Sequence, residues 1–247
     1  MNPVDINYGS RLRVGVLMPS GNQVAEPEIR AMLPPNVSPL VTRLALRGSS
    51  KPELMGMLDQ LEEASELLSH AAVDVIVFHC TAVSTFAPDL AAGIRQRIES
   101  ATGVKCFTTA DAIVHGLRTL GAERITLLTP YILEVHERER SFLEQNGFVV
   151  VGGDYLGVNE NAHMAKIPSE AIFDWASERL DPGADACLLS CTAIRSAPTI
   201  ARLEQRAGIP VLTSNQCTVW YLLRSSGIDA DPGSFGQLFA RGFELTA

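Results

Sequence analysis

The feature of this chain that most limits its fold is an internal repeat. The residues around Cys80 read VFHCTAVS, and those around Cys191, 111 positions further on (191 minus 80), read LLSCTAIR. Pro19 and Pro130 each end an apolar run, and the same 111 positions separate them (130 minus 19). Such a period far exceeds the roughly 20 to 50 residues of solenoid repeats. We therefore expect two homologous lobes.

Apolar runs alternate with helical patterns along the whole chain, as is typical of α/β proteins. Several runs are continuous stretches of Val, Ile and Leu, like parallel strands that are covered on both faces. Pro88 and Pro198 fit the first turn of a helix, where a missing N–H costs nothing. The expected strands are Arg13–Met18, Leu40–Leu46, Val73–Cys80, Val104–Thr108, Arg124–Thr129, Phe148–Tyr155, Ala186–Cys191 and Pro210–Thr213.

The repeat and the alternation together predict an α/β fold of two lobes related by a pseudo-two-fold axis. Each lobe is expected to be a parallel sheet of about four strands flanked by helices. The first lobe would comprise residues 10–110 plus 214–247 and carry Cys80; the second would comprise 111–213 and carry Cys191. Ligands of parallel sheets bind outside the carboxyl ends of the strands, so we expect the site in the cleft between the lobes.

The composition excludes several classes of protein. Of the 247 residues, 46% are hydrophobic and 19% are charged, which rules out a disordered chain. A net charge of −8 without a basic run argues against a nucleic-acid partner, and no apolar run is long enough for a membrane helix. The five irregularly spaced cysteines indicate neither disulfides nor a metal site, and the sequence lacks the glycine-rich phosphate loop of nucleotide-binding proteins. With no signal-peptide pattern, we expect a cytoplasmic protein without a cofactor.

Cys80 and Cys191 are the strongest candidates for chemistry. A lone cysteine at the end of a buried strand is usually a small apolar packing residue. Two cysteines at equivalent positions of a repeat, each followed by Thr-Ala, instead favour a pair of thiols on opposite sides of a small ligand. The hydroxyl and backbone N–H groups after each cysteine would bind carboxylate oxygens. The residues concerned are Thr81, Ala82, Thr192 and Ala193.

Several other residues leave two interpretations open. Asn22 fits a helix cap or a ligand contact, Tyr131 fits a packing position or the wall of a cleft, and Arg195 fits a solvated charge or a contact with an acidic substrate. His79 alternates with Cys80 along its strand and is expected to pack in the core. The remaining cysteines and histidines considered are expected in ordinary core or surface positions: Cys106, Cys187, Cys217, His70, His115 and His136.

From Val14 to about Arg224 the chain resembles the Asp/Glu racemase superfamily, and within it the branch of maleate isomerases and arylmalonate decarboxylases. Residues 19–28 read PSGNQVAEPE, which is similar to the opening of maleate isomerases. The resemblance implies that Cys80 and Cys191 are the catalytic cysteines of this chain. The substrate-binding residues that it implies are Asn22, Tyr131 and Asn161.

The resemblance also implies a mechanism without a cofactor. The Cys80 thiolate would add to the C=C bond of maleate or a substituted cis-butenedioate, after which rotation about that bond is easy. Cys191 would protonate the adjacent carbanion and later take the proton back. The partner is then a small dicarboxylate, and the resemblance suggests a homodimer or homotetramer.

Two alternative functions stay open. A racemase or decarboxylase would exchange protons at the α-carbon of a carboxylic acid without forming an adduct. Arylmalonate decarboxylases have glycine in place of Cys80, and amino-acid racemases usually carry Cys-Asn-Thr where this chain has Cys80-Thr81-Ala82. Both departures favour the isomerase. The other alternative is a binding or regulatory protein that has kept the scaffold, since a fold does not determine function.

Overall fold

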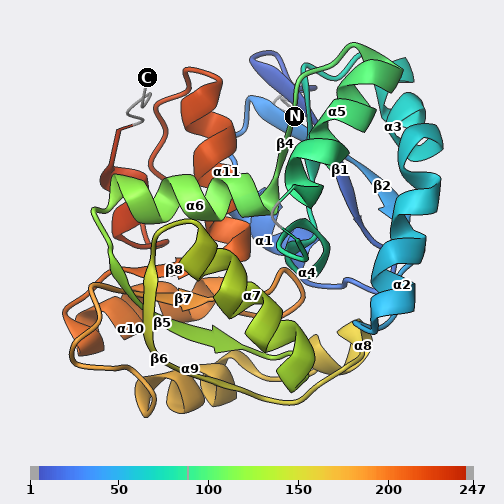
Figure 1. Cartoon of the computed structure of the whole chain (residues 1–247). Helices are drawn as coiled ribbons and strands as arrows, with labels where there is room; N and C mark the ends of the chain where they lie inside the picture. Colours follow the sequence, from blue (N-terminus) through green and yellow to red (C-terminus); the bar gives the residue numbers. More distant parts are fainter. Residues whose placement is uncertain (1–5, 88, 243–247) are drawn as a thin grey trace.

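The computed structural model describes residues 6–87 and 89–242 of the chain. Two four-stranded sheets contain only parallel strands and share one strand order, in which the first strand of each half lies second in its sheet. Figure 1 shows the two sheets in different halves of the molecule. The predicted α/β fold of two equivalent lobes is confirmed.

The first sheet comes from the amino-terminal half. Its strands are β1 (Leu12–Pro19), β2 (Val37–Leu44), β3 (Val75–Phe78) and β4 (Cys106–Thr108), in the order β2-β1-β3-β4. The helices that accompany it are α1 (Ala25–Met32), α2 (Lys51–Gly56), η1 (Met57–Gln60), α3 (Leu61–His70), α4 (Thr81–Ser84), α5 (Leu90–Thr102) and α6 (Thr109–Thr119).

The second sheet repeats this arrangement in the carboxyl-terminal half. Its strands are β5 (Arg124–Thr129), β6 (Val149–Tyr155), β7 (Ala186–Leu189) and β8 (Val211–Thr213), in the order β6-β5-β7-β8. The helices are α7 (Leu133–Gln145), α8 (Asn161–Met164), α9 (Ser169–Ser177), η2 (Ala197–Thr199), α10 (Ile200–Ala207), α11 (Ser214–Ser225) and η3 (Gln237–Ala240).

The predicted strand bounds need correction where the chain leaves the sheets. The runs expected to end at Cys80 and Cys191 stop at Phe78 and Leu189, because the chain makes one further bond to the neighbouring strand and then turns toward α4 or the loop before η2. β3, β4, β6 and β8 also begin one or two residues later than expected. β2 begins three residues earlier and ends two residues earlier than expected. Its first residues include Pro39, which the strand tolerates because it lies at the edge of the sheet.

Helices α6 and α11 pack against each other between the two sheets (Figure 1). Each begins with a capping box, made by Thr108 with Asp111 in α6 and by Thr213 with Gln216 in α11. Trp220 of α11 is fully buried in the apolar cluster that both halves share. α11 also packs on α1, so it contacts elements of both halves. The lobe boundaries at residues 110 and 213 stay a prediction.

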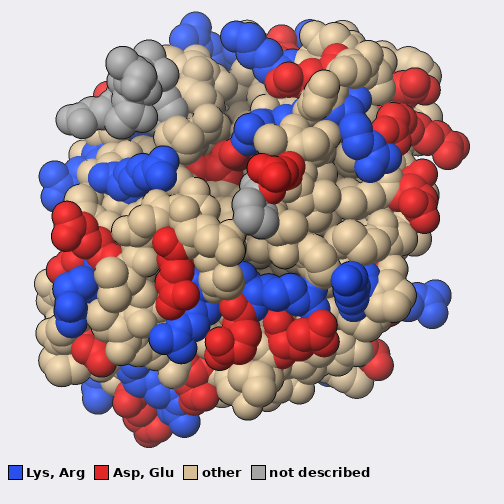
Figure 2. Space-filling view, viewed as in Figure 1, with Lys and Arg blue, Asp and Glu red and all other residues tan. Residues whose placement is uncertain are grey.

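Within residues 6–87 and 89–242, no helix is long and apolar enough to cross a membrane. Figure 2 shows Lys and Arg side chains interspersed with Asp and Glu over one face of the molecule. Pro198 lies in the first turn of η2, as expected. Pro88 and residues 243–247, the end of the first predicted lobe, lie outside the described residues.

Candidate active site

Both cysteines of the repeat lie just beyond the carboxyl ends of equivalent strands. Cys80 is the second residue after β3 and directly precedes α4, and Cys191 is the second residue after β7. Both are free thiols, and they are only 4% and 2% exposed. The other residues predicted for the site are buried as well: Asn22, Thr81, Ala82, Tyr131, Asn161, Thr192 and Ala193.

Each sulfur is approached by backbone N–H groups of its own loop. The Ala193 N–H donates to Cys191 Sγ at 3.2 Å, and the N–H groups of Val83 and Ala82 bond to Cys80. Burial raises the pKa of both thiols to about 12, whereas these N–H groups lower it because they stabilise a thiolate. Negative charge on Cys191 would raise the pKa of Cys80 further. The two thiols are therefore close enough to interact electrostatically.

Tyr131 and α8 complete the surroundings of Cys191. Tyr131, two residues after β5, hydrogen-bonds to the Cys191 thiol and is buried. Burial raises the pKa of its phenol well above the usual value, so the phenol is a proton donor at neutral pH. On another side, Cys191 Sγ lies 3.9 Å from the sulfur of Met164.

Asn22 serves as a cap and as a link between the halves. Its Oδ1 accepts the backbone N–H groups of Val24 and Ala25 at 2.9 Å, at the start of α1. Its Nδ2 donates to the carbonyl and hydroxyl oxygens of Thr192, both at 3.0 Å. Asn22 therefore caps the turn that leads into α1, whose own N-cap position is Val24, and the same amide holds the loop that follows Cys191.

Asn161, at the start of α8, carries an unused donor. Its side chain is 8% exposed, and its Nδ2 is buried without a hydrogen-bond partner among the residues that the structure describes. Gly21 lies against it, since a Cβ at Gly21 would be 3.6 Å from that nitrogen. A buried amide nitrogen without an acceptor is costly in a folded protein. Asn161 is thus placed to receive an acceptor from a ligand.

A second contact between the halves lies near Asn161. The Ser49 hydroxyl donates to Asn159 Oδ1 at 3.0 Å, and Gly48 forms an isolated bridge with Glu160. Figure 1 shows α8 beside α2 at this point. A cavity of about 440 Å³ lies next to this contact. Its lining comprises Ser20, Gly21, Asn22, Gln23, Arg43, Arg47, Glu160 and Ala162.

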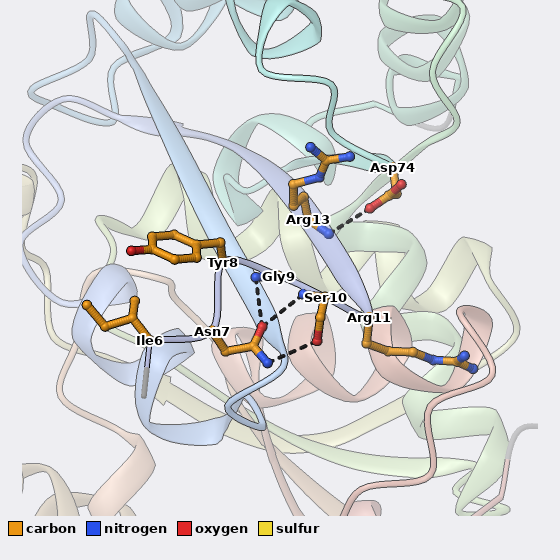
Figure 3. Close-up of a pocket in the computed structure, with 8 residues that line it drawn as sticks. All are labelled: Ile6, Asn7, Tyr8, Gly9, Ser10, Arg11, Arg13 and Asp74. Carbon is orange, nitrogen blue, oxygen red and sulfur yellow. Dashed lines mark hydrogen bonds between the residues drawn. The ribbon is translucent and has the colours of Figure 1, made fainter. Parts of the chain in front are cut away.

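Another hollow of about 440 Å³ lies at the amino ends of the strands of the first sheet (Figure 3). It is lined by residues 6–11 together with Arg13 and Asp74, which precede or begin β1 and β3. Within it, Asn7 Oδ1 accepts the backbone N–H groups of Gly9 and Ser10. This hollow is at the amino ends of the strands, whereas both thiols are at the carboxyl ends.

A buried polar chain runs from His79 to Glu28. Asn215 Nδ2 donates to Glu28 at 2.7 Å and to the Thr192 carbonyl at 3.3 Å, so its Oδ1 accepts the proton of His79 Nε2 at 2.8 Å. The imidazole is fully buried as expected, and the hydroxyls of Thr109 and Thr218 each lie 3.2 Å from its Nδ1. Burial lowers the pKa of His79 to about 4 and raises that of Glu28 to about 7. His79 is therefore neutral.

A second polar chain joins the two cysteine loops. Thr81 donates its hydroxyl proton to Ser214 Oγ at 2.9 Å, and the hydroxyls of Ser214 and Ser190 lie 3.3 Å apart. The Ser190 hydroxyl donates to a carboxylate oxygen of Glu139, a fully enclosed side chain of α7. Ser214 and Asn215 both lie in the first turn of α11. Through their hydrogen bonds this turn connects the loop of Cys80 to the loop of Cys191.

Sequence reasoning named His79, Thr81 and Thr192 of these two chains but missed Glu139, Ser190, Ser214 and Asn215. Glu139 had a signal, because it lies between Val135 and Leu143 on the face of α7 that is otherwise apolar and buried. A carboxylate at such a position is rarely left without a role. Ser214 and Asn215 had none, because their contacts depend on how α11 packs between the halves.

Known proteins resemble this chain over almost its whole length. A family model described as arylmalonate decarboxylase matches residues 14–239. The maleate isomerase of Nocardia farcinica is 31% identical, over 95% of this chain and 98% of that protein. The arylmalonate decarboxylase of Bordetella bronchiseptica is 29% identical, over 92% and 95%.

A solved structure of the Nocardia farcinica maleate cis-trans isomerase has the same fold. It is a cysteine-to-serine mutant with a covalently bound succinylcysteine intermediate. It superposes with a TM-score of 0.86 at 27% identity, over 92% of this chain and 98% of that chain.

Two equivalent α/β lobes that bring one thiol each into a shared buried site define an enzyme of the Asp/Glu racemase superfamily. The resemblance drawn from the PSGNQVAEPE segment and the paired cysteines is confirmed. Within that superfamily, the chain belongs to the arylmalonate decarboxylase family.

Proposed function

We propose that the protein catalyses cis-trans isomerisation of maleate or a substituted cis-butenedioate, with Cys80 as the nucleophile and Cys191 as the acid and base. The observation that carries this proposal is the pair of buried thiols within electrostatic reach of each other. The similarity to maleate isomerases supports it, and so does the succinylcysteine intermediate of one of them. That adduct is what thiolate addition to maleate produces.

In the proposed reaction, the Cys80 thiolate forms a C–S bond to one alkene carbon. The π electrons move to the neighbouring carbon, next to a carboxylate, and the Cys191 thiol gives that carbon its proton. Rotation about the resulting single bond brings the carboxylates to the trans arrangement. Cys191 then takes the proton back, the C=C bond forms again, and Cys80 leaves as thiolate. The N–H groups of Val83 and Ala82 stabilise the thiolate before addition and after release.

The substrate carboxylates need local donors, because a protein with a net charge of −8 does not attract a dianion as a whole. Asn161 Nδ2 is the first candidate, since it is buried without an acceptor among the described residues. The Tyr131 hydroxyl and the backbone N–H groups of the two cysteine loops would supply the others. Asn22 could bind a substrate carboxylate only by giving up its hydrogen bonds to Thr192. The hydroxyls of Thr192 and Thr81 also bond within the protein already.

Proton NMR of the reduced protein in D2O with maleate tests the reaction. Fumarate should appear, and separate samples with aspartate, glutamate and phenylmalonate should stay unchanged. Deuterium entering an α-position, or loss of CO2 from phenylmalonate, would assign the chain to the racemase or decarboxylase alternative instead. No change in any sample would overturn the proposal.

Variants of the two thiols separate their roles. Cys80→Ala and Cys191→Ala should each abolish turnover, whereas Cys106→Ala, a buried cysteine of β4, should retain it. Intact mass of Cys191→Ala incubated with maleate should show one substrate added, on the peptide of Cys80. Full activity in either thiol variant would refute the two-thiol mechanism.

We further propose that the enzyme is a cytoplasmic homodimer or homotetramer. The maleate isomerase resemblance supports the oligomer. Light scattering after size-exclusion chromatography tests it, and a mass of one chain, 26.6 kDa, would refute it.

A further inference from the structure

Glu139 is a carboxyl group that the proposed reaction does not use. It is 1% exposed, and only one of its oxygens has a partner, the Ser190 hydroxyl. The other oxygen, Oε2, is buried and makes no hydrogen bond to any described residue. Burying a carboxylate oxygen without a hydrogen-bond donor costs free energy, so such an arrangement in a folded protein calls for an explanation.

The carboxyl group lies beside the acid of the proposed reaction. Ser190 directly precedes Cys191, so the hydrogen bond from Ser190 attaches Glu139 to the backbone that carries that thiol. Negative charge on Glu139 raises the pKa of both Cys191 and its hydrogen-bond partner Tyr131. Charge on Glu139 therefore favours the protonated forms of both groups.

The surroundings of Cys80 differ in this respect. Carboxylate charge raises the pKa of Cys191 from two sides, Glu139 and Glu28, whereas the charge that does so for Cys80 among the described residues is that of Cys191. Two thiols at equivalent positions of a repeat are thus placed in unequal electrostatic surroundings.

We propose that Glu139 is a positioning residue that makes the Cys191 thiol harder to ionise than the Cys80 thiol, so that the thiolate forms on Cys80, the nucleophile, and Cys191 stays the acid. The inference rests on the proposed two-thiol function. Glu139 acts through its charge and through Ser190; it does not touch the reacting atoms.

No cation on the neighbouring elements offsets the charge of Glu139 in the described part of the chain. Arg138 and Arg140 of α7 pair with Glu134 and Glu144, and Asp154 of β6 pairs with Arg179. His136 bonds to the Thr129 hydroxyl instead. The titratable groups that interact with this carboxyl in the described part of the chain are Cys191 and Tyr131. The charged or titratable neighbours on its own helix are His136, Glu137, Arg138 and Arg140.

Thiol alkylation as a function of pH tests the inference. The full-length protein is treated with iodoacetamide between pH 6 and 11, and peptide mass mapping gives the alkylation midpoint of Cys80 and of Cys191, which is the pH at which half of that thiol is alkylated in a fixed time. Because both thiols have a pKa of about 12, the rate rises about tenfold per pH unit in this range, and the midpoint shifts by as much as the pKa. Glu139→Gln keeps an oxygen that can accept the Ser190 hydroxyl but removes the charge. We expect its alkylation midpoint at Cys191 to fall by about one pH unit, as for the loss of a unit charge about 12 Å away at an effective dielectric near 20. The midpoint of Cys80 should move much less.

The matched control is Glu137→Gln, which removes the same charge from an exposed position of the same helix and should shift neither midpoint. An unchanged Cys191 midpoint in Glu139→Gln, or an equal shift at both thiols, would overturn the inference. Circular dichroism and wild-type-like alkylation of Cys106 establish that the variant is folded.

Turnover separates this inference from the proposed function. At pH 8, where the Glu139 carboxyl with its pKa of about 7 is charged, kcat for maleate should fall about tenfold in Glu139→Gln while KM stays within about twofold. If the wild type does not convert maleate but the Cys191 shift is present, the substrate assignment fails and the role of Glu139 in setting thiol protonation stands. If the wild type converts maleate and the shift is absent, the substrate assignment stands and the role of Glu139 in setting thiol protonation fails.

Discussion

The buried carboxyl of Glu139 makes a prediction about stability that is independent of any substrate. Burial raises its pKa from 4.5 to about 7 in the folded protein. Between these two pH values the unfolded chain has lost the proton and the folded protein still holds it. Stability therefore falls as pH rises through this window. The contribution is fully present below about pH 4.5 and is lost above about pH 7.

The size of this effect follows from the shift. A difference of about 2.5 pH units corresponds to about 3 kcal/mol of unfolding free energy, at 1.36 kcal/mol per unit. Glu139→Gln has no proton to lose at this position. Its free energy of unfolding relative to wild type should therefore rise by about 3 kcal/mol from pH 4.5 to pH 8, which is on the order of 6–12 °C in Tm for a chain of this size.

Urea or thermal denaturation at half-unit steps of pH measures this difference. The exposed Glu137→Gln should give a curve parallel to that of the wild type, since its carboxyl is not buried. If Glu139→Gln is also parallel to the wild type, the carboxyl does not hold its proton in the folded state. The reasoning about its burial would then be wrong.

The remaining predictions concern single contacts. Asn161→Ala should raise KM for maleate by at least tenfold with little loss of stability, because its Nδ2 has no partner among the described residues; substrate titration and melting curves measure the two effects. Asn22→Ala should lower stability by about 1–3 kcal/mol in urea unfolding, because the residue holds both the turn that leads into α1 and the loop after Cys191. Gly153→Ala should yield little folded protein on expression, because its Cβ would lie 2.2 Å from a carbonyl oxygen of β5.

Much of the fold could be predicted from local patterns. Continuous apolar runs gave the strands, and the duplicated Cys-Thr-Ala segments predicted two equivalent sheets with Cys80 and Cys191 beyond matching strands. The ends of those strands were misplaced because apolar character continues to each cysteine, whereas pairing stops when the neighbouring strand no longer offers a partner. Apolar residues indicate burial and not strand pairing. In these two loops the buried residues continue beyond the last residue that pairs in the sheet.

The candidate site was less accessible to sequence reasoning. The motif and repeat pointed to Asn22, Tyr131 and Asn161, all of which are buried. Tyr131 hydrogen-bonds to Cys191, and Asn22 bonds to the residue that follows it. The links of Ser214 and Asn215 to both cysteine loops were not predictable, because they arise from the packing of α11 between the halves. No periodicity along the chain encodes such a contact.

The bridging turn of α11 has no true counterpart in the other half of the molecule. Aligned by their capping boxes, Ser214 and Asn215 correspond to Thr109 and Ala110 of α6, and an alanine cannot supply an amide. A dimer of two identical half-chains related by rotation would surround both thiols with the same groups and give them the same proton affinity. Joining two unlike copies in one chain removes that constraint, so that one sulfur can remain an acid while its counterpart becomes a base.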